Sequence, residues 1–106
     1  MTTKTRRQQI EEMLAADPND AMLRYMLAME YVSAGDDDGA VRCFQELIRI
    51  TPDYPPAYHQ AGRAFQRLNR SADARALLLQ GIPIAQKKGD SHAAGEMTEL
   101  LQSLDN

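Results

Sequence analysis

The chain has 106 residues, 43% of them hydrophobic, and a net charge of −3 at pH 7. This length supports one compact domain, residues 1–106, with a modest core. The acidic excess argues against a nucleic-acid partner, because such binders usually carry a basic excess. Cys43 is the only cysteine, so no internal disulfide forms. The N-terminus has no apolar signal core, and no apolar run approaches the ~20 residues that cross a bilayer. We therefore expect a cytoplasmic protein with no membrane partner.

Six segments of helical length follow one another along the chain. Clusters rich in Gly, Pro, Asp, Asn and Ser separate them at 17–20, 34–39, 51–56, 68–71 and 87–91. Between these clusters apolar residues recur three and four positions apart, which is the spacing of an amphipathic helix. In chain order, the predicted helices span about 4–16, 20–34, 37–50, 55–69, 71–87 and 90–104. No segment shows sustained strand alternation, so the predicted fold class is all-α.

The residues at the segment ends agree with helices. Four side chains are able to accept a hydrogen bond from the free N–H groups of a helix start, and the predicted N-caps are Asp20, Asp36, Ser71 and Asp90. Pro55 suits a first helical turn, and Gly35 and Gly89 suit helix ends. Pro83 lies inside the fifth segment, where its missing N–H donor and its bulky ring predict a kink.

A period of 34 residues relates the middle four segments. The matched pairs are Pro18 and Pro52, Ala28 and Gly62, Tyr31 and Phe65, Ala40 and Ala74, and Phe44 and Leu78. Paired helices with this period resemble the tetratricopeptide repeat. Residues 21–54 match the pattern of that family with Leu27, Ala28, Tyr31, Ala40, Phe44 and Pro52. Residues 55–88 match it with Tyr58, Gly62, Phe65, Ala74 and Leu78.

Three residues depart from that pattern. Arg24 stands where a large apolar residue is usual, Gly81 stands for Ala, and Gln86 stands for Pro. The resemblance implies a right-handed α–α superhelix of about six antiparallel helices. Two full repeats, 21–54 and 55–88, are then completed by half-repeat helices at 4–16 and 90–104. Residues 85–97 also resemble the end of a widespread group of small bacterial tetratricopeptide proteins.

The sequence offers little for catalysis or metal binding. Cys43, His59 and His92 are the only soft or borderline ligands, and no CxxC or HxxxH spacing joins them. No phosphate-binding glycine loop is present, and no nucleophile motif flanks either histidine. The acidic run at 36–38 lacks the spaced ligands of a calcium loop and suits a helix start. We expect no enzyme and no cofactor, and we interpret Cys43 as a partly buried structural residue.

The resemblance implies a concave surface lined by the first helix of each repeat. The predicted partner-binding residues are Met22, Tyr25, Met29, His59, Arg63, Gln66, Arg67 and Met97. Flexible Met side chains beside arginines predict a groove for a short apolar and acidic peptide. The alternative interpretation is that the Met residues pack between helices and the arginines form a solvated face. The chaperone-binding subclass of the family uses Lys and Asn where this chain has Tyr25 and Met29, so that clamp is disfavoured.

Two functions from different classes remain. The first is a non-catalytic adaptor that binds a peptide or helix of a partner protein in the groove. The second is a self-associating structural protein, a homodimer or a head-to-tail assembly formed through the end helices. Opposite charges at the two ends motivate the second function. The basic residues at the start are Lys4, Arg6 and Arg7, and the acidic residues near the end are Glu96, Glu99 and Asp105.

Overall fold

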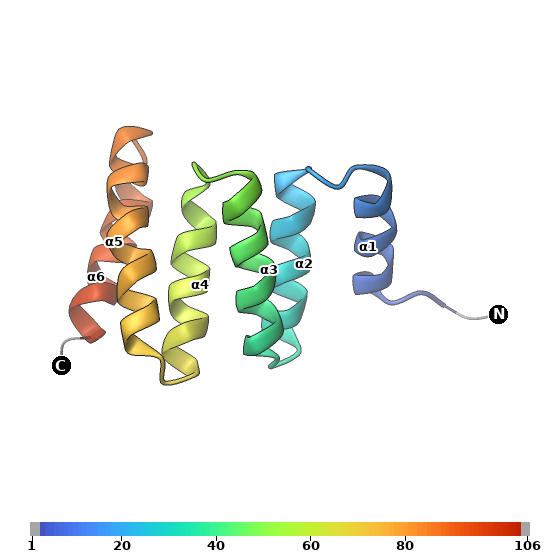
Figure 1. Ribbon diagram of the computed structural model, residues 1–106, viewed down its shortest axis with the longest axis horizontal. Coiled ribbons are helices and arrows are strands. Elements are labelled where there is room, and N and C mark those ends of the chain that lie inside the picture. The colour runs from blue at the N-terminus through green and yellow to red at the C-terminus, as the bar shows by residue number, and fades with distance from the viewer. Residues whose placement is uncertain (1–2, 105–106) are drawn as a thin grey trace.

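The computed structural model describes residues 3–104, and all regular secondary structure in that range is helical. The six helices are α1 (Arg6–Ala16), α2 (Ala21–Ser33), α3 (Asp37–Ile50), α4 (Pro55–Arg67), α5 (Ser71–Lys87) and α6 (Ser91–Leu104). They stand side by side in an elongated array of 50 × 28 × 20 Å, with the N- and C-termini at opposite ends (Figure 1). The six predicted helices and the all-α solenoid fold are confirmed.

Each helix packs against its neighbours in the chain, and α4 also packs against α6. Contact between α4 and α6 is expected of the first helices of successive repeats, which share one layer. We call α2, α4 and α6 the first-helix layer. The contact between α1 and α2 is the smallest of those between consecutive helices, since α1 buries only Ile10 and Leu14.

Three of the four predicted N-caps are confirmed. The carboxylates of Asp20 and Asp36 each accept a hydrogen bond of 2.9 Å, from the backbone N–H groups of Leu23 and Gly39. The carboxylate of Asp90 accepts one of 3.0 Å from the N–H of Ala93. These bonds satisfy donors that a helix start otherwise leaves unpaired.

The prediction for Ser71 is wrong. Ser71 is the first residue of α5, and the N-cap is Arg70, whose side chain makes no capping bond. The Arg70 guanidinium instead lies 4.8 Å from the centre of the Phe65 ring and pairs with Asp73 at 2.8 Å. The helix therefore begins one residue earlier than a serine cap would allow.

The glycines and prolines mark helix ends as expected. Gly35 and Gly89 both have φ of +74°, the left-handed conformation that follows many helices, and Pro55 is the first residue of α4. Pro83 lies inside α5, which runs unbroken from Ser71 to Lys87, so the kink expected at Pro83 stays a prediction.

Gly81 shows why one residue departs from the family pattern. A Cβ atom at Gly81 would lie 2.5 Å from Cβ of Tyr58 and 2.8 Å from Sδ of Met97. These distances are too short for any side chain, so α5 approaches α4 and α6 more closely at Gly81 than an alanine allows. The close approach completes a core that includes Leu78, Ala85 and Met97.

Candidate partner-binding surfaces

The predicted groove residues on α2 differ in how much side chain they present. Met22 is 67% exposed in the first turn, whereas Tyr25 and Met29 are half-buried and pack against the core that contains Phe44. The ring centroids of Tyr25 and Phe44 are 6.0 Å apart, and those of Tyr25 and Tyr54 are 5.8 Å apart. Met22 is thus free to contact another molecule, while Tyr25 and Met29 also hold the fold together.

Burial also changes the acidity of Tyr25. Its partial burial raises the pKa of the phenol, and the nearby Tyr54 raises it further, while a hydrogen bond with Gln60 of α4 acts in the opposite direction. The phenol therefore stays neutral at physiological pH.

The predicted residues of α4 include two arginines of the first-helix layer. Arg67 is already paired, since its Nε and Nη2 atoms lie 2.9 and 2.8 Å from Oδ1 of Asp37. Arg63 and Gln66 are exposed, and the described residues provide no ion-pair partner for Arg63. The predicted cationic wall therefore reduces to Arg63.

His59 is half-buried between α4 and α6. Burial lowers the pKa of its imidazole, the charge of Glu96 opposes that shift, and Arg63 and His92 reinforce it. On α6, Nε2 of His92 lies 2.7 Å from Oε1 of Glu96. His92 and Glu96 were not among the predicted groove residues, although their i, i+4 spacing on one helix face is visible in the sequence.

The prediction for Met97 is wrong. Its side chain is 0% exposed and packs in the core with Tyr58 and Leu78. The cause is the glycine at 81, which lets α5 close over the sulfur atom. The repeat pattern assigned Met97 to the groove side of α6, but the close approach of α5 covers it.

The cations at the N-terminal end are paired within the molecule. Lys4 lies 2.6 Å from Glu12, Arg6 lies 3.0 Å from Glu30 of α2, and Arg7 lies 3.9 Å from Glu11. At the other end, Asp105 lies outside the described residues. These pairs reduce the charge that the N-terminal helix presents to a neighbouring molecule.

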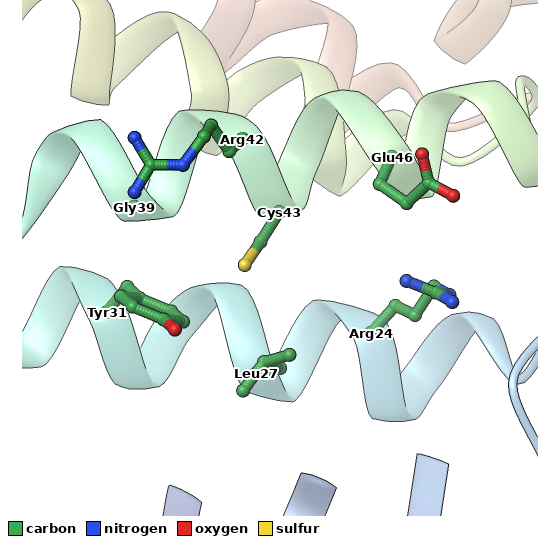
Figure 2. Close-up of a pocket in the computed structure, with 7 residues that line it drawn as sticks. All are labelled: Arg24, Leu27, Tyr31, Gly39, Arg42, Cys43 and Glu46. Atoms are coloured by element: carbon green, nitrogen blue, oxygen red, sulfur yellow. The ribbon is translucent and has the colours of Figure 1, made fainter. Parts of the chain in front are cut away.

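A second surface feature, absent from the sequence predictions, lies between α2 and α3. It is a cavity of about 240 Å³, which we call the α2–α3 slot. Its lining residues are Arg24, Leu27, Tyr31, Gly39, Arg42, Cys43 and Glu46. In Figure 2 the thiol of Cys43 points from α3 toward α2, between Arg42 on one side and Arg24 and Glu46 on the other. Cys43 is half-buried, as expected from the sequence, and burial raises the pKa of its thiol.

Two properties of residues 3–104 bear on function. No group of three or more His, Cys, Asp or Glu side chains in this range is placed to hold a metal ion. In the same range, no helix has both the length and the apolar character that crossing a membrane requires.

Comparisons with known proteins give concordant results. A TPR repeat family model matches residues 28–69. A TPR repeat-containing protein of Pseudomonas aeruginosa is 35% identical over 96 residues, which span 91% of each chain. The crystal structure of a tetratricopeptide repeat domain protein from Salinibacter ruber has a TM-score of 0.77 at 30% identity, covering 81% of this chain and 96% of that one. The solution structure of a protein from Bordetella parapertussis has a TM-score of 0.83 at 25% identity, covering 97% and 90%. This fold commonly mediates protein–protein interactions.

Proposed function

The chain belongs to the tetratricopeptide repeat family, and we propose that it is a non-catalytic adaptor that holds a segment of a partner protein on its first-helix layer. The supporting observation is that exposed Met22 on α2 and Arg63 on α4, a cation without an ion-pair partner among the described residues, belong to the same layer. Two other charges on the layer are already paired, Arg67 with Asp37 and Glu30 with Arg6 of α1. The cytoplasmic location expected from the sequence stays a prediction.

The chemistry of the layer favours an apolar segment that also carries a carboxylate. The thioether of Met22 and the exposed edge of Tyr25 suit apolar contact, because a flexible Met side chain adapts to different shapes. The planar guanidinium of Arg63 suits a carboxylate, with which it forms two parallel hydrogen bonds. Half-buried His59 lies on the same helix, one turn before Arg63.

A matched set of charge-introducing variants tests this proposal. We would capture partners from the native cytoplasm with wild-type protein, Met22→Glu, Arg63→Glu and the control Leu79→Glu. Leu79 is a fair control because it is 56% exposed but lies on α5, outside the first-helix layer. Met29 is avoided because it packs against the core. We expect the two layer variants to lose partners that the control retains, and equal retention by all three would overturn the proposal.

Self-association is the alternative, and light scattering over a dilution series distinguishes it. The cations of α1 are already paired within the molecule, and the exposed face of α6 includes Gly95, Glu96, Glu99 and Gln102. We therefore expect a constant mass of one chain at every concentration. A mass that rises with concentration would favour the homo-oligomer instead.

A further inference from the structure

The α2–α3 slot lies where the chain begins its first full repeat. The second repeat has an equivalent position, 34 residues further along, between α4 and α5. The slot residues Tyr31 and Cys43 correspond there to Phe65 and Leu77. The two positions share the same backbone pattern. The position between α4 and α5 therefore shows which side chains the fold can place in the space that forms the slot between α2 and α3.

At the second position the space is closed by aliphatic side chains. Val41 of α3 packs in one cluster with Phe65 and Leu77. Ile48 of α3 packs with Leu77 against the cluster that contains Tyr58. Phe65 and Tyr58 are each only 2% exposed as a result.

At the first position the corresponding residues leave the space open. Arg7 of α1 takes the place of Val41, and its guanidinium carbon lies 5.1 Å from the centre of the Tyr31 ring. Leu14 takes the place of Ile48 and is buried, so the difference on the preceding helix lies at Arg7.

Cys43 is smaller than Leu77. The space beside Gly39 is taken by the Tyr31 ring, with which a Cβ atom at Gly39 would clash. Tyr31 is half-buried, where its counterpart Phe65 is buried. Cys43 and Leu77 are both half-buried, and each packs against a core cluster.

The charges at the rim of the slot differ in how they are used. Glu46 is held by Arg49 through hydrogen bonds from Nε and Nη2. Arg24 donates from Nε to the carbonyl oxygen of Pro18 at 2.6 Å. Neither Arg24 nor Arg42 takes part in an ion pair within residues 3–104. Arg42 is the more exposed of the two, and it is the cation that we assign to a ligand.

We propose that the α2–α3 slot is a second docking site, which takes an aliphatic side chain from a partner segment whose neighbouring carboxylate pairs with Arg42. The volume is adequate, because an apolar cavity of about 150 Å³ already admits benzene and the slot has about 240 Å³. The apolar floor of Leu27, Tyr31 and Cys43 supplies the same kind of contact that Val41 and Ile48 make at the second position. The slot uses α2 of the first-helix layer, but none of its lining residues is among the predicted groove residues.

Cys43 allows the proposal to be tested with defined probes. Three disulfide reagents serve as probes. The first carries mercaptopropionyl-leucine with a free carboxylate, and the second carries the same leucine amide ending in an ammonium group. The third carries mercaptopropionyl-glycine with a free carboxylate. The Cys43 thiolate exchanges with each reagent, releasing one equivalent of thiol and forming a mixed disulfide. At a fixed concentration of 2-mercaptoethanol, intact-mass measurement gives the labelled fraction at equilibrium, which reports non-covalent binding of the probe.

We expect the leucine carboxylate probe to label Cys43 at least about fivefold more than the glycine probe, because its side chain leaves water in the slot. We expect a preference of similar size over the ammonium probe, because only the carboxylate can pair with Arg42. Arg42→Gln should remove the preference over the ammonium probe and keep the preference over glycine. Arg63→Gln is the matched control and should change neither. In Cys43→Ala/Ala76→Cys, which moves the thiol to the exposed face of α5, all three probes should label alike.

Either of two results would overturn the proposal. Equal labelling by the leucine and glycine probes would exclude an aliphatic site. If both leucine probes label equally, and the Arg42→Gln variant labels like the wild type, recognition of a carboxylate by Arg42 is excluded. Neither result bears on Met22 and Arg63, so the proposed function of the first-helix layer stands or fails separately.

Discussion

The helix pairs α2–α3 and α4–α5 use the same positions of a 34-residue period. Side chains fill the space between α4 and α5, whereas the equivalent space between α2 and α3 is open. Phe65 is 2% exposed between Val41 and Leu77, whereas its counterpart Tyr31 is half-buried beneath Arg7 and beside Cys43. The backbone pattern therefore determines which positions meet, and the side chains on the preceding helix determine whether the space between them is filled.

The difference follows from the side chains of α1, which has 11 residues against the 14 of α3. Arg7 and Glu11 stand in the places of Val41 and Gln45. Arg7 lies over the Tyr31 ring of α2, so a charged side chain takes the position that a valine fills in front of Phe65.

The largest test of this comparison truncates the two matched aromatic rings. Phe65→Ala should lower the free energy of unfolding by about 3–5 kcal/mol, because a buried ring leaves a cavity. Tyr31→Ala should cost less than half as much, since its ring already borders an open slot. Urea denaturation of both variants measures the difference. Equal losses would mean that the two starts are equally well packed.

A second test adds one methyl group where the C-terminal packing is tightest. Gly81→Ala should destabilise by about 1–3 kcal/mol, because its Cβ would press on Tyr58 and Met97. Gly95→Ala in α6 is the control, since nothing lies within 4 Å of its Cβ, and it should stabilise by about 0.5–1 kcal/mol. Thermal unfolding should show a lower melting temperature for Gly81→Ala and a higher one for Gly95→Ala, relative to the wild type. A Gly81→Ala variant as stable as the wild type would contradict the close approach of α5.

A third test exchanges the matched residues of the two repeats. Cys43→Leu introduces the residue that repeat two has at this position, and partial filling of the slot should stabilise by up to about 1 kcal/mol. Leu77→Cys makes the reverse change and should destabilise by about 1–2 kcal/mol. Urea midpoints of the two variants provide the measurement. A destabilised Cys43→Leu variant would show that the slot does not accept an aliphatic group.

Much of this fold was predictable because its signals are local or periodic. The caps Asp20, Asp36 and Asp90 and the 34-residue period follow from the sequence alone. Met97 was misplaced because its burial depends on the close approach of α5 at Gly81, which periodicity does not report. The α2–α3 slot was missed for a similar reason, since it arises from the sizes of side chains on three different helices.

The smallest expected effect is a dependence of the folding stability on pH, and it should arise in α4 and α6 rather than in α1 and α2. Burial lowers the pKa of His59 below its ordinary value of 6.5, so the unfolded chain binds this proton more readily than the folded protein. The contribution of His59 to the free energy of unfolding should therefore be constant above pH 6.5 and should fall as the pH drops below that value.

His59→Gln removes that contribution, so its urea midpoint should decline less than that of the wild type between pH 7 and pH 5. Using the difference between the two proteins cancels the carboxylates that titrate in the same range. Hydrogen exchange should locate the wild-type weakening in α4 and α6, whose residues His92, Glu96 and Arg63 surround the imidazole. Weakening confined to α1 and α2, or equal slopes in both proteins, would show that His59 is not the group responsible.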